Sequence, residues 1–443
     1  MSWLQRASNQ STPQAREWDV TNSPEEKWVR HYKNRLIKEA NLESITTLPP
    51  HERKQTIERL VKQMIDEEKV IIPSQEMERI IRQIINESVG YGPLEALLQD
   101  DGITEIMVNG ANEVYIERGG KMQETDIQFK DDQHIRHIID RIIAPLGRRI
   151  DESSPMVDAR LPDGSRVNAV IPPISLDGPS ISIRKFNKTP FTLEDLQGFG
   201  TFTDEMGRFL QAAVKAKTNI LVSGGTGSGK TTLLNVLSDS IPLGERVVTI
   251  EDMAELRFTY ENLVRLEARP PNMEGKGEVT IRQLVKNALR MRPDRIIVGE
   301  VRGSEAIDML QAMNTGHEGS LTTVHANSPK DALGRLEAMV VMSGLPITVD
   351  IIRGYFVGAL DLIVQTSRQP DGGRKIVSIA EIAEVNGEIE IHDIFRYVRE
   401  GVTADGKVKG HFEATGYRPN LVDRFKAYGV ELPDSLFLEG AIV

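Results

Sequence analysis

Eight consecutive residues in the second half of the 443-residue chain have the composition of a phosphate-binding loop. Residues 224–231 read GGTGSGKT and fit the pattern G-x-x-x-x-G-K-[ST]. Glycines let a backbone approach phosphate oxygens and point its N–H groups at them, and the helix that follows adds the positive end of its dipole. An apolar strand precedes the loop and a helical run follows it, which is the context that nucleotide binding requires.

The polar side chains of this loop have separate expected roles. Lys230 can reach the β- and γ-phosphates and is expected to be catalytic, and the Thr231 hydroxyl can ligate Mg²⁺. The residues predicted to bind the nucleotide are Gly224, Gly225, Thr226, Gly227, Ser228, Gly229, Lys230, Thr231 and Thr232. The loop alone does not distinguish a kinase, a switch GTPase and a motor.

Acidic residues follow two apolar strands elsewhere in this half of the chain. Glu300 ends the segment RIIVGE, whose strand is expected to lie beside the phosphate-loop strand, and Glu251 with Asp252 follows the strand at 247–250. Ligands of open α/β sheets bind at the carboxyl ends of the strands. One acid would therefore orient metal-bound water while another polarises the attacking water, and the sequence leaves open which is the general base. The predicted metal ligands are Thr231, Glu251 and Glu300.

Two histidines flank a third predicted strand. His317 precedes it and His325 ends it, within the run TGHEGSLTTVHAN at 315–327. A pair at the ends of one strand beside a nucleotide site could sense the γ-phosphate, so His325 is a candidate catalytic residue and His317 a candidate nucleotide-binding residue. A metal pair is less consistent with their spacing, which matches no familiar ligand pattern. Ordinary packing is the remaining alternative.

Composition excludes several classes of protein. The net charge of −11 disfavours a broad basic face for duplex DNA or RNA. The chain has no cysteine, so disulfides and cysteine zinc sites are excluded. No apolar signal segment is visible at the start, and the most apolar stretch, 339–364, contains Asp350, Arg353 and Asp361. We therefore expect two packed helices and a strand there instead of a membrane span, and a cytoplasmic location.

The first half of the chain divides into three predicted regions. Residues 1–22, rich in Ser, Gln, Asn and Thr, are expected to form a mobile tail. A capping box at Ser23 opens a helical domain over 23–90, in which apolar residues recur at i, i+3, i+4 and i+7. Strand and turn patterns, such as Asn109-Gly110, predict an α+β domain over 91–188 with a helix at 135–145. A turn-rich linker is expected at 186–202.

The remaining residues, 189–443, alternate strands with helices. This alternation predicts a parallel sheet with helices on its faces, and hence an α/β fold. Turn signals at Asp371-Gly372 and Asp405-Gly406 predict hairpins in a C-terminal extension. The predicted fold class is therefore an α/β P-loop NTPase domain with a parallel-sheet core, preceded by an α+β domain and an N-terminal helical bundle.

The order of these segments resembles a known family. The phosphate loop, TIED at 249–252, RMRPDRIIVGEVRG at 290–303 and TTVHAN at 322–327 stand in the order of the Walker A, Asp box, Walker B and His box. That order is typical of the RecA-like secretion ATPases of type II secretion, type IV secretion and type IV pili. The upstream runs DARLPDGSRVNA at 158–169 and SIRKF at 182–186 are similar to the CpaF branch, which powers the tight-adherence (Flp) pilus. The lack of a four-cysteine zinc site agrees with that branch.

The resemblance, which covers about residues 90–425, implies further properties. It implies a homo-hexameric ring that hydrolyses ATP with Mg²⁺, between an α+β domain and a RecA-like domain. Arginines of the α+β domain would then neutralise γ-phosphate charge, a role carried to Arg160, Arg166 and Arg184, with Arg166 and Arg184 as catalytic candidates. The motor would act on an inner-membrane platform protein, and so indirectly on pilin, from the inner face of the cytoplasmic membrane.

Other classes remain as alternatives at this stage. A type IV secretion or DNA-transfer motor would share the same ATPase core, although the acidic charge and the absence of a basic, aromatic-interleaved stretch count against direct nucleic-acid binding. A nucleotide-gated scaffold with little turnover is disfavoured by the two acids. A small-molecule kinase lacks any acceptor-site or lid pattern.

Overall fold

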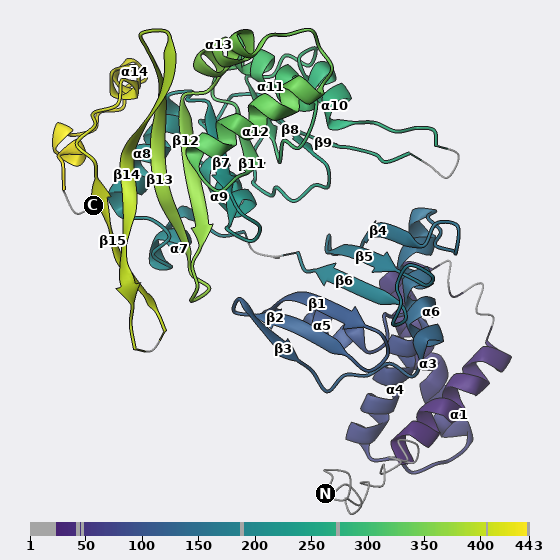
Figure 1. The fold of residues 1–443 in the computed structure, drawn as a ribbon. Coiled ribbons are helices and arrows are strands. Elements are labelled where there is room, and N and C mark those ends of the chain that lie inside the picture. Colours follow the sequence, from purple (N-terminus) through teal and green to yellow (C-terminus); the bar gives the residue numbers. More distant parts are fainter. Residues whose placement is uncertain are drawn as a thin grey trace, which may run out of the picture. The chain divides into compact units, whose positions relative to one another are not determined.

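The computed structural model describes residues 24–40, 45, 48–186, 190–271, 275–404 and 406–440 (Figure 1). They form two compact units, Met1–Phe186 and Asn187–Val443. The predicted tail at 1–22 and the predicted capping residue Ser23 lie outside the described residues. The division after Phe186 lies two residues before the predicted end of the α+β domain at 188.

The first unit begins with three packed helices. These are α1 (Pro24–Glu39), α3 (Pro50–Glu67) and α4 (Ser74–Ser88). A proline opens both α1 and α3, where its missing N–H removes no helical hydrogen bond. The side chains that the helices bury recur at helical spacing and include Tyr32, Leu36, Ile57, Val61, Ile80 and Ile84. Among the described residues, the structure confirms the three helices predicted here.

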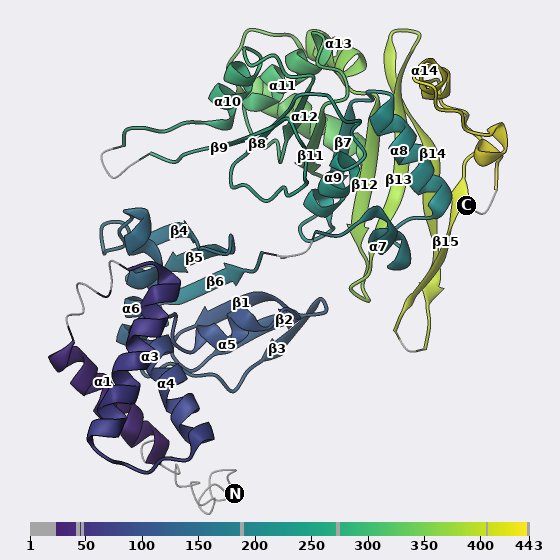
Figure 2. The same cartoon turned by 180° about the vertical axis from the view of Figure 1, so that it is seen from behind.

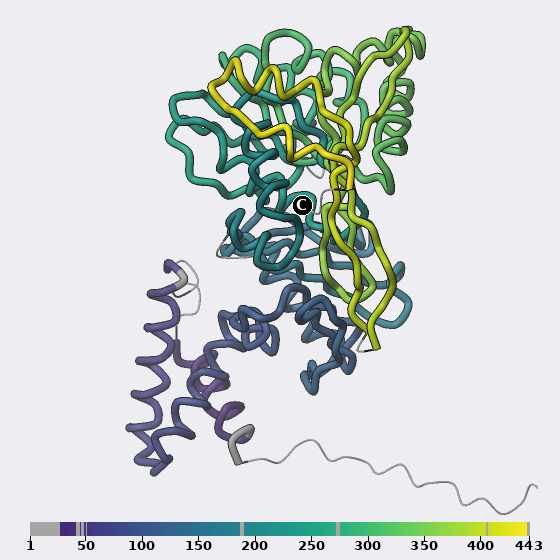
Figure 3. Tube along the Cα trace, turned by 90° about the vertical axis from the view of Figure 1, so that its left-hand side faces the viewer, coloured from purple at the N-terminus to yellow at the C-terminus, as the bar shows by residue number. Residues whose placement is uncertain are grey.

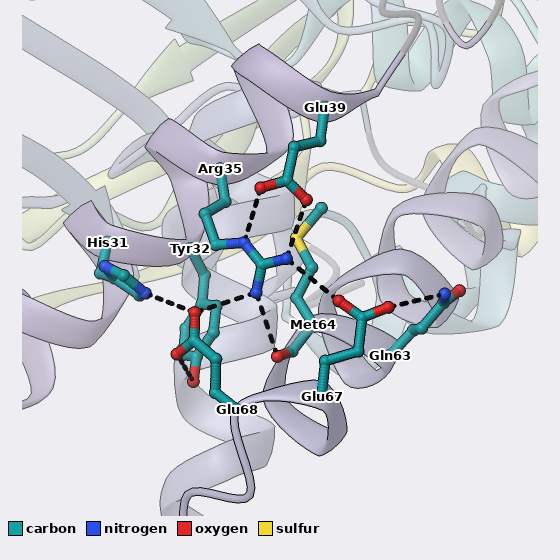
Figure 4. Close-up of polar contacts among 8 residues, drawn as sticks. All are labelled: His31, Tyr32, Arg35, Glu39, Gln63, Met64, Glu67 and Glu68. Atoms are coloured by element: carbon teal, nitrogen blue, oxygen red, sulfur yellow. Dashed lines mark hydrogen bonds and ion pairs between the residues drawn. The ribbon is translucent and has the colours of Figure 1, made fainter.

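A polar cluster also joins α1 to the end of α3 (Figure 4). The Arg35 guanidinium pairs with Glu39 at 2.8 Å, with Glu67 at 3.0 Å and with Glu68 at 2.9 Å. The Tyr32 hydroxyl donates to Glu68 at 3.1 Å, and burial together with this bond raises the pKa of Tyr32 to about 12. Charge pairing therefore adds to apolar packing in fixing α1 on α3.

A six-stranded antiparallel sheet completes the first unit, in the order β3-β2-β1-β6-β5-β4. Its elements are α5 (Leu94–Gln99), β1 (Ile103–Asn109), β2 (Val114–Arg118), β3 (Lys121–Glu124), α6 (Asp132–Ile143), β4 (Met156–Arg160), β5 (Arg166–Val170) and β6 (Ser180–Arg184). The isoleucines of α6 and the apolar residues of the sheet share one core. The β1–β2 hairpin confirms the predicted turn. Helix α6 begins three residues before the predicted 135, because the Asp131 side chain accepts a hydrogen bond from the His134 N–H.

The segment between the two sheets differs from its prediction. We expected a turn-rich linker at 186–202, but the structure places helix α7 (Leu193–Gly198) inside it, followed by α8 (Asp204–Lys215). Thr192 and Asp195 form a reciprocal capping box that starts α7. The linker expectation missed this cap because only one turn of apolar spacing follows it.

The second unit contains a nine-stranded sheet in the order β15-β14-β13-β12-β7-β11-β10-β8-β9. Its parallel strands are β7 (Ile220–Gly224), β8 (Val247–Glu251), β9 (Leu263–Glu267), β10 (Arg295–Val298), β11 (Leu321–His325) and β12 (Leu362–Arg368). The predicted neighbour of the phosphate-loop strand was wrong. Strand β11 lies between β7 and β10, so it is the His325 strand, and not the Glu300 strand, that adjoins β7.

Helices cover both faces of this sheet (Figure 2). Ile220 and Val222 of β7 pack in one core with α8, α9 (Lys230–Ser238) and α14 (Leu421–Ala427), whereas Leu221 packs in the other. That second core includes α10 (Ile281–Ala288), α11 (Glu305–Asn314), α12 (Pro329–Met342) and α13 (Val349–Ala359). Alternate strand residues therefore face opposite helical layers, as in an α/β fold. None of the described helices combines the length and apolarity needed to cross a bilayer.

The C-terminal extension continues the sheet as an antiparallel ribbon (Figure 3). It consists of β13 (Arg374–Val385), β14 (Glu388–Val402) and β15 (Val408–Ala414), paired in sequence after β12. The turn at Asp371-Gly372 joins β12 to β13, as predicted. Asp405 of the second predicted turn lies outside the described residues, and β14 and β15 pair on either side of it.

Candidate functional site

The phosphate loop joins the central strand β7 to helix α9. Every residue of β7 is buried, and α9 begins at Lys230. Gly227 and Gly229 have φ angles of 68° and 96°, a region that residues with a side chain rarely adopt. A Cβ built on Gly224 would lie 2.3 Å from the Thr366 hydroxyl and 2.4 Å from the Ser228 hydroxyl. The loop therefore needs glycine for its backbone shape and for close packing against β12.

Two hydroxyl groups hold the loop against β12. The Ser228 Oγ donates to the Gly225 carbonyl at 2.9 Å and lies 2.8 Å from the Thr366 Oγ1. Thr366 in turn donates to the Ser223 carbonyl at 3.1 Å. Ser228 is only 3% exposed, so its side chain braces the loop and leaves its backbone N–H as the group available to a phosphate. No local pattern in the sequence indicates this role for Thr366.

Lys230 lies over the loop that precedes it. Its Nζ donates to the Gly224 carbonyl at 3.0 Å and to the Gly225 carbonyl at 2.9 Å. An ammonium group is a compact point charge on a flexible stem, so it can exchange carbonyl oxygens for phosphate oxygens by a small rotation. Thr226 is exposed and Thr231 and Thr232 are partly exposed at the start of α9.

Glu251 ends β8 and is buried, at 3% exposure. Its Oε1 accepts hydrogen bonds from the backbone N–H groups of Glu255 at 2.7 Å and Leu256 at 2.9 Å. Its Oε2 is also buried and has no hydrogen-bond partner among the described residues. Burial raises the pKa of this carboxyl, and the two backbone donors offset part of that effect. A nearby cation would stabilise the charged form.

Glu300 follows β10, the strand next to β8. The Arg302 Nη2 lies 2.7 Å from its Oε2, and the Arg302 Nη1 lies 3.9 Å from the Asp252 carboxylate. The bond to Glu300 raises the pKa of Arg302. A Cβ built on Gly299 would lie 3.0 Å from the Glu251 Cγ, so a glycine before Glu300 lets the two acidic segments pack closely. Sequence reasoning missed Arg302, although it stands only two residues after Glu300.

The two histidines lie near opposite ends of strand β11. His325 is the last residue of β11, directly opposite Gly224 in the parallel pairing with β7. His317 precedes the start of β11, and its Nδ1 lies 3.2 Å from the Ala312 carbonyl near the end of α11. The structure therefore places His325 at the carboxyl ends of the strands, beside the phosphate loop, and His317 near the opposite, amino-terminal ends.

The candidate arginines of the α+β domain form one row. Arg160, Arg166 and Arg184 stand opposite one another on β4, β5 and β6. Arg184 lies 3.6 Å from Glu105, its partner on β1. This row belongs to the first unit, whereas the phosphate loop, Glu251, Glu300 and His325 belong to the second.

About two thirds of this chain is similar in sequence to known proteins. The family described as Type II/IV secretion system protein matches residues 87–368. A putative conjugal transfer protein of Mycobacterium tuberculosis is 38% identical over 310 residues, which cover 69% of this chain and 88% of that protein. The type IV secretion system protein VirB11 of Bartonella quintana is 33% identical over 325 residues, covering 65% of this chain and 90% of its own.

A solved structure was also matched. The VirB11 ATPase of the Brucella suis type IV secretion system, crystallised in complex with sulphate, is 32% identical to this chain. The match covers 65% of this chain and 94% of the other, with a TM-score of 0.36.

The close packing of Gly224 against Thr366 predicts that a side chain at this position lowers the stability of the fold. Gly224→Ala is expected to lower the free energy of unfolding by about 1–3 kcal/mol, because the new methyl group must displace backbone and two hydroxyls. Gly225→Ala is the matched control, since nothing lies within 4 Å of a Cβ built there, and should change it by no more than about 0.5 kcal/mol. Urea denaturation followed by circular dichroism measures both, and equal losses would contradict the packing argument.

Proposed function

The chain belongs to the type II/IV secretion system protein family, and on this premise we propose that it is the motor ATPase of a secretion or pilus machine. The observation that carries the proposal is the carboxyl edge of the sheet. There the phosphate loop, His325, Glu300 and Glu251 stand at or just after the ends of four neighbouring strands, β7, β11, β10 and β8, where open α/β sheets bind their ligands.

Different groups at the carboxyl ends of these strands would bind the phosphates and the metal ion during ATP hydrolysis. The backbone N–H groups of the loop and Lys230 hold the β- and γ-phosphates. Thr231, Glu251 and Glu300 are hard oxygen donors that suit Mg²⁺, and the buried Glu251 Oε2 is an acceptor for metal-bound water. When bound, Mg²⁺ would neutralise charge on the β- and γ-phosphates.

The two acids fit different roles. Glu251 is fixed by two backbone N–H donors and buried, which suits an acid that orients a metal-bound water. Glu300 is paired with an exposed arginine and its side chain is 27% exposed, so it is free to turn toward an attacking water once Arg302 releases it. We therefore assign to Glu300 the polarisation of that water, and to His325, across from Gly224, contact with the γ-phosphate.

Two substitutions separate binding from turnover. Lys230→Ala is expected to weaken ATP binding and to lower kcat at least about a hundredfold, because a cationic donor to the phosphates is lost. Glu300→Gln should keep ATP affinity within about threefold while lowering kcat by about 10²–10⁴, because the amide cannot polarise water. Steady-state phosphate release and equilibrium binding of ATP measure these effects.

Lys215→Ala, an exposed lysine at the end of α8, is the control and should match the unmodified chain. Retained hydrolysis in the Lys230 variant would refute the ATPase assignment. Unchanged turnover with Glu300→Gln would remove only Glu300 from the mechanism.

We further propose that the chain forms a homo-hexameric ring and that its arginine row completes the nucleotide site. Three guanidinium groups on one face of a sheet are a natural site for phosphate charge. In a closing cleft, Arg160 would bind the nucleotide while Arg166 and Arg184 stabilise the transition state. ATP binding would then draw the α+β domain and the RecA-like domain together, and hydrolysis would release them.

Arg166→Ala tests this row. Turnover is expected to fall about 10³-fold, because an arginine on the transferring phosphate is worth that much or more, while the ring still assembles. Arg118→Ala is a matched control, since Arg118 is an exposed arginine of the same sheet that pairs with Asp100 at 2.6 Å. Light scattering reports assembly and phosphate release reports turnover. An intact ring with unchanged hydrolysis would contradict the role.

The machine that the motor drives is proposed to be a tight-adherence type IV pilus. The runs at 158–169 and 182–186 support it, because they resemble the CpaF branch and form β4, β5 and β6. The motor would work at the cytoplasmic face of the inner membrane on a multi-span platform protein, and through it on pilin. The second candidate is a type IV secretion or DNA-transfer machine, which the names of its relatives support.

A pull-down of the full chain from solubilised membranes separates these machines. Recovery of a multi-span platform protein together with pilins is expected for the pilus. Salt-dependent DNA binding that stimulates ATP hydrolysis would instead favour DNA transfer, since phosphate contacts weaken steeply as salt rises. The Lys230→Ala variant serves as the control for partners that bind only the nucleotide-bound state.

A further inference from the structure

The start of strand β13 contacts the phosphate loop from the C-terminal extension. Arg374, its first residue, donates from Nε to the Gly227 carbonyl at 3.0 Å. A Cβ built on Gly229 would lie 3.4 Å from the Arg374 Cδ, so the stem of the arginine also packs against the loop. Arg374 is exposed and stands opposite Arg368 of β12 in the antiparallel pair.

This hydrogen bond acts on one of the peptide groups that form the phosphate cradle. The Gly227 carbonyl and the Ser228 N–H belong to the same trans peptide and so point in opposite directions. Holding the carbonyl therefore sets the direction of the N–H. In this structure that N–H makes a long bond, 3.4 Å, to the Gly225 carbonyl, which a phosphate oxygen could readily replace.

The next two residues of β13 hold a different segment. The Lys375 Nζ donates to the Gly200 carbonyl, and the Ile376 N–H donates to the Thr201 carbonyl at 2.9 Å. Lys375 is partly buried and its Nζ lies 5.7 Å from the ring centroids of Tyr397 and Phe412, and burial lowers its pKa. Gly200 and Thr201 join α7 to α8, in the stretch of chain that leads from the first unit into the sheet.

Three consecutive residues thus contact two separate segments of the chain. Arg374 holds the phosphate loop, and Lys375 and Ile376 hold the α7–α8 junction. These three residues pair with Arg368, Ser367 and Thr366 of β12, and β13 pairs with β14 from Ser378 onward. Strand β12 is itself tied to the loop through the bond between Thr366 and Ser228. A ligand that restrains the loop therefore also restrains the junction.

We propose that Arg374 is a positioning residue for the phosphate loop, and that the start of β13 couples nucleotide binding to the α7–α8 junction. The inference rests on the proposed nucleotide site. In this proposal, the C-terminal ribbon links the presence of bound nucleotide to the conformation of the α7–α8 junction, which lies in the segment leading from the first unit. Coupling of this kind is reciprocal. If nucleotide binding shifts the conformation of the junction, then a change in that conformation must shift the affinity for the nucleotide by the same free energy.

The first test measures ADP binding to the full chain by calorimetry. Arg374→Ala is expected to weaken ADP binding about three- to tenfold, and Arg374→Lys to restore part of the loss, because a charged donor to Gly227 returns. Arg396→Ala is the matched control, an exposed arginine of β14 that pairs with Glu413 at 2.6 Å. Thermal unfolding midpoints should be the same in all three variants, which excludes a general loss of structure.

The second test measures amide hydrogen exchange in residues 199–203, with and without saturating ADP. Binding should slow exchange there in the unmodified chain and in Arg396→Ala. For the Arg374→Ala variant, the ADP concentration is raised until the protein is saturated. The exchange rates of residues 199–203 should then be the same with and without ADP.

The outcomes distinguish the coupling from the nucleotide site itself. An unmodified chain that binds ADP, beside an Arg374→Ala variant with the same affinity and the same exchange response, would overturn the coupling alone. An unmodified chain that fails to bind ADP would refute the proposed function.

Discussion

The space between β7 and β12 at Gly224 admits no side chain, and this constraint shapes the site. Because the two strands approach so closely, the hydroxyls of Thr366 and Ser228 can meet and fix the loop. The same approach brings the β12–β13 hairpin within reach of Gly227. A phosphate cradle depends on backbone N–H groups, which have no side chain to orient them, so their precision has to come from neighbours such as these.

The charged groups at this edge have local partners. Lys230 donates to two carbonyls of its own loop, and Arg302 pairs with Glu300 at 2.7 Å. Glu251 keeps a buried oxygen without a partner among the described residues, and its pKa is raised. Nucleotide and metal together would satisfy these groups at once, which is a physical reason for the site to change its contacts on binding.

Local patterns in the sequence located the groups at this edge but not the contacts that support them. The loop, Glu251, Glu300 and His325 each end or follow a strand whose apolar run is visible in the chain. Thr366 acts on Ser228 across 138 residues, and no local pattern reveals that pairing. The order of strands is equally non-local, which is why β10 was expected beside β7, where β11 in fact lies. Helix α7 was missed because a single capped turn carries little periodicity.

The arginine row places three like charges side by side on one sheet of the first unit. Like charges directly opposite one another on neighbouring strands destabilise a sheet, and here Arg160, Arg166 and Arg184 occupy adjacent positions on three strands. Glu105 beside Arg184 offsets part of that repulsion. A polyphosphate has the opposite charge and guanidinium groups bind its oxygens well, which is the physical basis of the role proposed for this row.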